Sequence, residues 1–150
     1  MKVIALLVAG ILFIAASCHD KTKATIQPLS TNAIAGTYKL IEPASKFAVT
    51  LVLTPDSASS EISNRVAYKI GGRSAVNHYF ATLTGSSASN AVQMSAIGAT
   101  KMAGPPDAMQ FETDYFKKLQ AVKRYELTGN RLRLFAEGEA AGELVYEKEK

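Results

Sequence analysis

Residues 122–136 read VKRYELTGNRLRLFA, two runs of alternating apolar and polar residues joined by the pair Gly129-Asn130. Alternation with a period of two is typical of a β-strand that buries one face. Glycine and asparagine both tolerate positive φ, which the tight turn of a β-hairpin requires. The stretch therefore predicts two antiparallel strands, Val122–Thr128 and Arg131–Ala136, and indicates a fold built from hairpins.

Further strands are expected upstream and downstream of this hairpin. The clearest is Phe47–Thr54, which alternates, is rich in β-branched residues, and ends at a turn over residues 55–57. Expected turns at Gly71-Gly72 and at residues 85–87 separate the other candidates, which are Gly36–Glu42, Ser60–Asn64, Ala67–Ile70, His78–Leu83, Ala91–Ile97 and Gly142–Glu147. The predicted fold class is α+β, mostly β: an antiparallel sheet or partly closed barrel of about seven to nine short strands with one amphipathic helix packed on it.

That helix is predicted over Ala108–Gln120. Pro105-Pro106 opposes an earlier start, Asp107 is placed to cap the first free N–H groups, and Gln110 follows it as in a capping box. Projected at 100° per residue, the apolar side chains fall within one arc, and they are Ala108, Met109, Phe111, Tyr115, Phe116 and Leu119. This arc is expected to lie on the sheet.

Glu112 lies near the middle of the apolar arc, where an ionised carboxylate without a partner is strongly disfavoured. Two interpretations follow. In the structural one, Glu112 accepts hydrogen bonds from backbone N–H groups, a hydroxyl, or a base such as Lys101 or Arg124. In the functional one, it is a site carboxylate in a cleft.

Several of these segments together resemble a known domain. The segment from Thr100 to Pro105, the helix residues Met109, Glu112, Phe116 and Leu119, and the hairpin resemble the second half of a META domain, the module of HslJ-type envelope lipoproteins. Residues 34–40 resemble the family's opening Leu-x-Gly-x-Trp-x-Leu. The resemblance places a META-like domain at 34–147 with a tail at 148–150, and its family-motif or structural positions are Gly36, Tyr38, Asn77, Lys101, Met102, Pro105, Glu112 and Tyr125.

The chain departs from the family pattern in two places together. Val76 and Gly104 stand where many relatives carry cysteines. If those cysteines pair in the relatives, losing both leaves no stray thiol, whereas losing one would leave a reactive group in an oxidising compartment. A third departure puts Tyr38 in the place of the family's tryptophan, so its hydroxyl is expected to reach a partner or water.

The N-terminus has the pattern of an export signal. Lys2 precedes an apolar run too short to span a bilayer, small residues follow, and residues 14–18, IAASC, resemble a bacterial lipobox. We expect a signal peptide at 1–17 and a flexible tether at 18–33 that carries lipid on Cys18, with ordinary cleavage after Ser17 as the alternative. Asp20 does not directly follow Cys18, which favours an outer-membrane lipoprotein facing the periplasm and leaves the inner membrane or the cell surface open.

The charge balance favours loose contact with anionic surfaces. The chain has 17 basic against 13 acidic residues, and removing Lys2 with the signal leaves 16 basic residues. The basic residues are scattered without the cluster that nucleic-acid binding uses, so nucleic acid is not an expected partner. The expected partners are the membrane, through lipidated Cys18, and envelope proteins or anionic surface molecules.

The sequence offers little for catalysis. His19 lies in the tether, so a histidine-based triad would depend on His78, and there is no cluster of metal ligands. We therefore expect no catalytic residues, no metal and no cofactor. Arg131 and Arg133 alternate with leucines and share one strand face, either solvated or in contact with an anion.

The leading hypothesis is a non-catalytic, lipid-anchored envelope protein that acts through surface contacts. A role in envelope stress and antibiotic tolerance is implied by the resemblance to HslJ-like proteins. A periplasmic small-ligand binder is the alternative, with a cavity between sheet and helix lined by Tyr38, Phe47 and Phe116. A hydrolase of envelope material is a third reading, which would need His78 or Glu112 in an accessible cleft.

Overall fold

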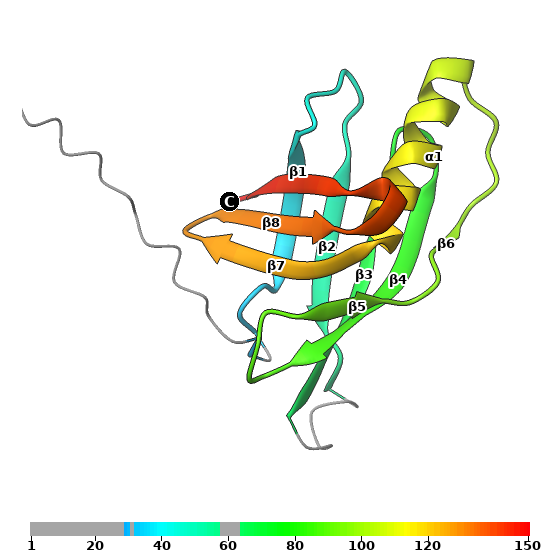
Figure 1. Cartoon of the computed structure of the whole chain (residues 1–150). Coiled ribbons are helices and arrows are strands. Elements are labelled where there is room, and N and C mark those ends of the chain that lie inside the picture. The colour runs from blue at the N-terminus through cyan, green and yellow to red at the C-terminus, as the bar shows by residue number, and fades with distance from the viewer. Residues whose placement is uncertain (1–28, 31, 58–63) are drawn as a thin grey trace, which may run out of the picture.

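The computed structural model describes residues 29–30, 32–57 and 64–150 (Figure 1). The predicted signal peptide, Cys18, most of the predicted tether and all of the Ser60–Asn64 candidate except Asn64 lie outside the described residues. The elements in chain order are β1 (Gly36–Glu42), β2 (Thr50–Pro55), β3 (Arg65–Arg73), β4 (His78–Ser86), β5 (Val92–Met94), β6 (Gly98–Ala99), α1 (Pro106–Gln120), β7 (Val122–Thr128), β8 (Arg131–Ala136), a 3-10 turn (Gly138–Ala140) and β9 (Gly142–Lys148).

The strands that the structure describes form a single nine-stranded antiparallel sheet in the order β5-β4-β3-β2-β1-β9-β8-β7, with β6 paired to β4. The two ends of this order meet, because Ala91 bridges Arg124 and the Tyr125 N–H donates to the Asn90 carbonyl at 3.1 Å. The sheet is therefore a nearly closed barrel, and the predicted fold class is confirmed. Figure 1 shows β7, β8 and β9 crossing in front of the long strands β2, β3 and β4.

Helix α1 lies beside the β8–β9 connection and covers one side of the barrel (Figure 1). Its buried residues are Ala108, Glu112, Tyr115 and Leu119, so the predicted apolar arc does face the sheet. At its C-terminal end the Gln120 amide donates to the carbonyls of Met94 and Ser95 at 3.3 and 2.9 Å. These bonds join the helix to the last residue of β5 and to the residue that follows it. Among the described residues, no helix is both long and apolar enough to cross a bilayer.

The predicted start of the helix needs a correction. The helix begins at Pro106, the N-cap is Pro105, and no side chain caps the first N–H groups. Proline lacks an N–H and has a preset φ, so it suits the first helical position and does not oppose it. Asp107 lies inside the first turn, where it forms an ion pair with Lys46 at 2.5 Å, and Gln110 bonds to Asp114 instead of completing a capping box.

The first predicted turn and the start of the second, which was expected over residues 85–87, prove to be strand, and the second turn begins at Ser87. Gly71-Gly72 lies within β3, and Gly85 lies within β4. A Cβ on Gly72 would be 2.1 Å from the Thr50 carbonyl oxygen, so glycine is needed here for close approach of two strands and not for a turn. At Gly85 a Cβ would be 2.8 Å from a methyl group of Leu29.

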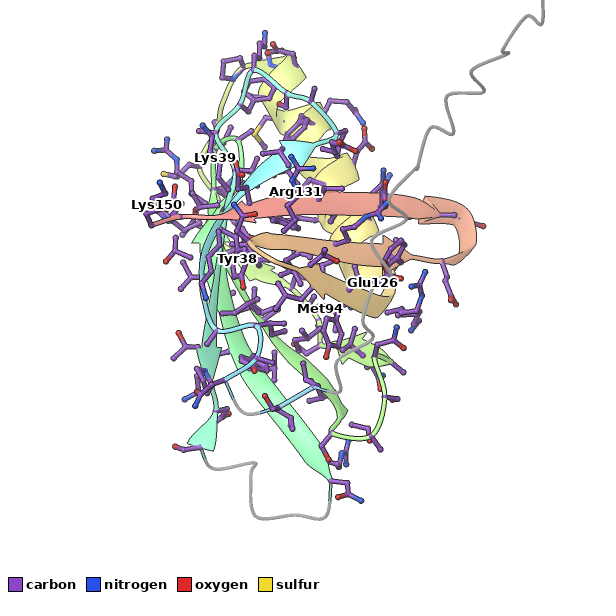
Figure 2. All side chains as sticks on the ribbon, turned by 90° about the vertical axis from the view of Figure 1, so that its left-hand side faces the viewer. Tyr38, Lys39, Met94, Glu126, Arg131 and Lys150 are labelled. Carbon is purple, nitrogen blue, oxygen red and sulfur yellow. The ribbon has the colours of Figure 1, made fainter. Side chains whose placement is uncertain are left out.

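The folded part of the chain begins earlier than Ile34. Leu29 is 0% exposed and belongs to the same core as Ile34, and the Tyr68 hydroxyl donates to the Ser30 carbonyl at 2.5 Å. Residues that we assigned to the tether are thus part of the packed domain. The physical reason is that an isolated leucine among polar residues shows no periodicity in the sequence, yet gains its full burial in the barrel. Tyr38 and Met94 also point into this core (Figure 2).

Candidate functional site

Glu112 lies at the centre of a buried polar cluster between α1 and the β3–β4 connection. Its side chain is 5% exposed. Its Oε2 accepts hydrogen bonds from the Ser74 hydroxyl and from the backbone N–H groups of Val76 and Asn77, the last two at 3.1 and 2.8 Å. Its Oε1 accepts from Asn77 Nδ2 at 2.6 Å. The carboxylate therefore holds the helix against the turn between two strands.

Asn77 extends this cluster to the segment between β6 and α1. Its Oδ1 accepts from the Thr100 hydroxyl at 2.8 Å and from the Met102 N–H at 2.7 Å, and its Nδ2 also donates to the Met102 carbonyl at 3.3 Å. The Ser74 N–H and hydroxyl both donate to the Asn77 carbonyl at 2.9 Å. Among the described residues, no buried side-chain nitrogen or oxygen lacks a partner. The cluster thus joins three separate segments through one side chain.

The environment of Glu112 keeps it ionised. Burial by itself raises the pKa of this carboxyl, but the hydrogen bonds from Ser74, Asn77 and Val76 outweigh it and lower the pKa below its ordinary value. The structural interpretation predicted that backbone N–H groups and a hydroxyl donate hydrogen bonds to Glu112, and this part of it is confirmed. The named bases are not its partners, because Arg124 pairs with Glu126 at 2.5 Å and Lys101 is exposed.

A second buried polar feature is a chain of three tyrosines that the sequence did not reveal. The Tyr79 hydroxyl donates to the Thr50 carbonyl at 2.8 Å and is 2.7 Å from the Tyr115 hydroxyl, which is 3.1 Å from that of Tyr146. Because Tyr79 uses its proton on Thr50, Tyr115 must donate to Tyr79, and Tyr146 to Tyr115. Burial, followed by the repulsion of neighbouring phenolates, raises the pKa of all three well above 10.

The predicted ligand cavity between sheet and helix does not have the predicted lining. Tyr38 is fully buried and its hydroxyl donates to the Ile34 carbonyl at 3.1 Å. Phe47 packs against Phe111 with ring centroids 5.2 Å apart, and Phe116 packs against Tyr79 at 5.5 Å. Aromatic packing therefore fills this region.

Two recesses lie along α1 instead. One of about 110 Å³ is lined by Pro43, Phe111, Asp114, Tyr115, Lys118 and Leu144. The other is an open hollow of about 610 Å³ lined by Asp114, Lys117, Lys118, Glu139, Ala140 and Ala141. The first is smaller than the usual range for ligand sites, and the second is a charged surface hollow.

His78 and Glu112, the two residues that a hydrolase would need, differ in exposure. His78 is exposed on β4, and its backbone N–H donates to the Thr100 hydroxyl at 3.1 Å. Every acceptor bond described for Glu112 comes from the protein itself. In the described part of the chain, no three histidine, cysteine, aspartate or glutamate side chains gather in a way that could hold a metal.

Of the remaining family-motif residues, Gly36, Pro105 and Tyr125 have a place in the fold itself, whereas Lys101 and Met102 have exposed side chains. Gly36 has φ +141°, and a Cβ there would be 2.5 Å from Lys148 Cε, so glycine is required. Tyr125 is buried in the core, and Pro105 precedes the helix. Lys101 and Met102 are exposed.

The two arginines of β8 differ in exposure and in their hydrogen-bond partners. Arg131 is exposed, whereas Arg133 donates from Nε and Nη2 to Glu143 Oε2 at 3.1 and 2.7 Å. Arg124 from β7 lies over the Phe135 ring with its Cζ 3.8 Å from the centroid. The positive charge of this face is thus largely compensated by carboxylates of the same sheet.

Comparison with known proteins gives one family and one solved structure. The model of the META domain matches residues 48–149. An NMR structure of a protein from Burkholderia xenovorans superposes with a TM-score of 0.56 at 14% sequence identity, covering 100% of this chain and 98% of that chain. At that identity the likeness shows the fold alone. No curated protein matches the chain.

Proposed function

Because the chain belongs to the META domain family, we propose that it is a lipid-anchored protein of the bacterial envelope that acts through surface contacts and not through catalysis. The observation that carries the non-catalytic part is the state of Glu112. Its carboxylate accepts four bonds from Ser74, Val76 and Asn77, and it is 5% exposed. A substrate would have to break this cluster to reach it.

The anchor rests on the sequence. Lys2, the apolar run and IAASC at 14–18 form the pattern from which we infer acylation of Cys18. The proposed location is the outer membrane, facing the periplasm. A contribution to envelope stress responses and antibiotic tolerance is proposed from the resemblance to HslJ-like proteins.

The anchor is tested by mass spectrometry of the mature N-terminus. The chain is produced with its own signal in a Gram-negative host, and the membrane fraction is compared with that of a Cys18→Ser variant. We expect a diacyl- or triacyl-modified Cys18 peptide in the membrane fraction and its loss in the variant. Recovery of the native chain in the medium with an unmodified N-terminus would contradict the proposal.

The mode of action is tested by cross-linking in intact envelopes. Partners recovered with the native chain are compared with those recovered with a Glu112→Gln variant that is still folded at the growth temperature. We expect the same partners, since Glu112 holds the interior and not a contact surface. Turnover of envelope material by the purified chain that the variant abolishes would show that the protein is an enzyme.

A small-ligand binder remains the second candidate because of the hollow of about 610 Å³ beside α1. Its lining combines Lys117 and Lys118 with Asp114 and Glu139, which suits a zwitterionic ligand. Thermal-shift screening of amino acids and short peptides tests it. Stabilisation that disappears in Lys118→Ala would support this candidate over the contact protein.

A further inference from the structure

The outer surface of β3, β4 and β6 has an unusual composition. Strand register places Gly71 opposite Phe80 and Phe80 opposite Gly98, so these three residues form one row across the surface. Residues directly opposite each other in an antiparallel sheet point to the same side. We call the surface around this row the Phe80 face, and its members are Val52, Lys69, Gly71, Arg73, His78, Phe80, Thr82 and Gly98.

Phe80 is a large apolar side chain that the fold leaves in the open. It is 66% exposed. A Cβ on Gly98 would be 2.4 Å from Cε2 and Cζ of the Phe80 ring, so the far end of the ring occupies the space that a side chain on β6 would take. The ring therefore leans along the sheet and does not project from it. With glycine on both sides in its row, it forms a flat and accessible aromatic surface.

Positive charge surrounds this ring. Lys69 and Arg73 lie two residues before and after Gly71, the partner of Phe80, so both are diagonal neighbours of the ring at about 7–8 Å between backbones. Residues 64–106 include Arg65, Lys69, Arg73 and Lys101 and no aspartate or glutamate. Three ion pairs lie elsewhere in the described part of the chain, at Lys46–Asp107, Arg124–Glu126 and Arg133–Glu143.

The excess of positive charge is particular to the Phe80 face, as a comparison with β8 shows. On β8, Arg133 is neutralised by Glu143 from the neighbouring strand. On the Phe80 face, the strands β2 to β6 contribute no acidic residue, and Asp56, which directly follows β2, lies opposite Ala67, toward the other end of β3 from Arg73. Figure 2 shows Lys39 of β1 on the outer side of the same sheet, but its cross-strand partner on β9 is Glu147, so the positive charge of the Phe80 face is that of Lys69 and Arg73. The face therefore has charge complementary to an anionic partner.

We propose that the Phe80 face binds an anionic glycan strand, with a sugar ring stacked on Phe80 and acidic groups of the glycan paired to Lys69 and Arg73. The Phe80 ring lies along the sheet against Gly98, so it offers one face for stacking on a sugar ring and no projecting end for insertion among acyl chains. The Thr82 hydroxyl beside the row, opposite Lys69, adds a hydrogen-bonding group for sugar hydroxyls. This inference rests on the proposed function, because an envelope location would bring the face to such polymers.

The experiment measures binding of the detergent-solubilised chain to polygalacturonate, a polymer with one carboxylate per sugar, by isothermal titration calorimetry. Neutral dextran and vesicles of phosphatidylglycerol and phosphatidylcholine are titrated in parallel. We expect binding to polygalacturonate alone, weakened by rising salt. Tighter binding to the vesicles than to the polymer, or no binding to the polymer, overturns the proposal.

Substitutions separate stacking from charge. We expect Phe80→Ala to weaken binding roughly tenfold, within the range of aromatic contacts. Gly98→Ala keeps the ring and every charge but removes the ring's resting place, so it should weaken binding as well. Arg73→Glu should weaken it more than Lys123→Glu, a matched charge change at an exposed residue of β7.

An equal loss in Arg73→Glu and Lys123→Glu, or full binding by Phe80→Ala, would reduce the interaction to general charge attraction and overturn the site. Thermal melts followed by circular dichroism check that each variant is folded. We expect Phe80→Ala to fold, because the Phe80 side chain is exposed and does not support the core. Binding in solution does not depend on Cys18. The failure of this inference is therefore distinguishable from a failure of the anchor.

Discussion

Position 104 lies directly against Val76. A Cβ built on Gly104 would be 2.6 Å from Val76 Cγ2 and 3.5 Å from Val76 Cβ. The latter is the separation that a disulfide requires between its Cβ atoms. From the resemblance to META domains, these are the two positions at which cysteines are expected in relatives. In this chain the valine methyl groups fill the space that the missing side chain at 104 leaves.

The double variant Val76→Cys/Gly104→Cys is therefore expected to form a disulfide, in a Cys18→Ser background that prevents mispairing. Closing the loop between residues 76 and 104 should stabilise the fold by about 3–4 kcal/mol in the chain-entropy model. Melting curves with and without a reductant measure this difference. Free thiols in the oxidised double variant, quantified by alkylation, would show that the two positions are not adjacent.

Gly104→Ala alone should destabilise the fold. The added methyl meets Val76 at a distance that forces a shift, and overpacking of this kind costs about 1–3 kcal/mol. Adding Val76→Ala should recover part of the loss, because it vacates the contacted space. Denaturant unfolding of both singles and the double gives the coupling, and additive effects would contradict the contact.

Glu112→Gln should lower the free energy of unfolding by about 1.5–3 kcal/mol at pH 7, the range for hydrogen bonds to a charged group. The hydrogen bonds lower the pKa of Glu112 in the folded state, so its contribution is present above the unfolded value of about 4.3 and is lost as the pH falls through the lower folded value. The difference from the native chain should therefore shrink in acid. Urea unfolding between pH 3 and 7 measures it.

Asp114→Asn is the matched control for this prediction. Asp114 lies on the exposed side of the same helix and bonds to Gln110 at 3.0 Å. We expect a change of a few tenths of a kcal/mol with little dependence on pH. A loss as large as that of Glu112→Gln would show that helix charge, and not the buried cluster, determines stability.

The tyrosines predict the alkaline limit of the fold. Burial raises the pKa of Tyr38 and Tyr125 to about 12, raises that of Tyr79, Tyr115 and Tyr146 well above the ordinary value, and also raises the pKa of Tyr68. Because the folded values exceed the unfolded value of about 10, this contribution is complete below pH 10 and is lost as the pH rises above it.

Tyrosinate absorbance should therefore appear together with unfolding above about pH 10, and not before it. Absorbance near 295 nm and far-ultraviolet circular dichroism, recorded on the same samples, check this coincidence. The chain in guanidinium chloride serves as the reference for ordinary titration. A tyrosinate signal that develops while the circular dichroism is unchanged would mean that the phenols are accessible.

Local patterns were sufficient for much of the barrel. The predicted bounds of Gly36–Glu42, Val122–Thr128 and Arg131–Ala136 agree with β1, β7 and β8. In these segments the alternation of apolar residues and the positions of turn residues predict the same strand bounds, because both depend only on neighbours in the sequence. The sequence also predicted that Glu112 needs hydrogen-bond partners, since it is a charged residue on the apolar face of a helix.

Contacts between distant segments decided the rest. The sequence by itself determined that the chain forms paired strands and one helix with a carboxylate to satisfy. The tertiary structure alone decided that Ser74 and Asn77 donate hydrogen bonds to this carboxylate and that Gly72 allows the close approach of β3 to Thr50. It also decided that Leu29 joins the core and that Phe80 remains exposed. The reason is physical. Burial and hydrogen-bond partners depend on which strands become neighbours in the closed sheet, and the pattern of residues along the chain does not say which distant segments come together.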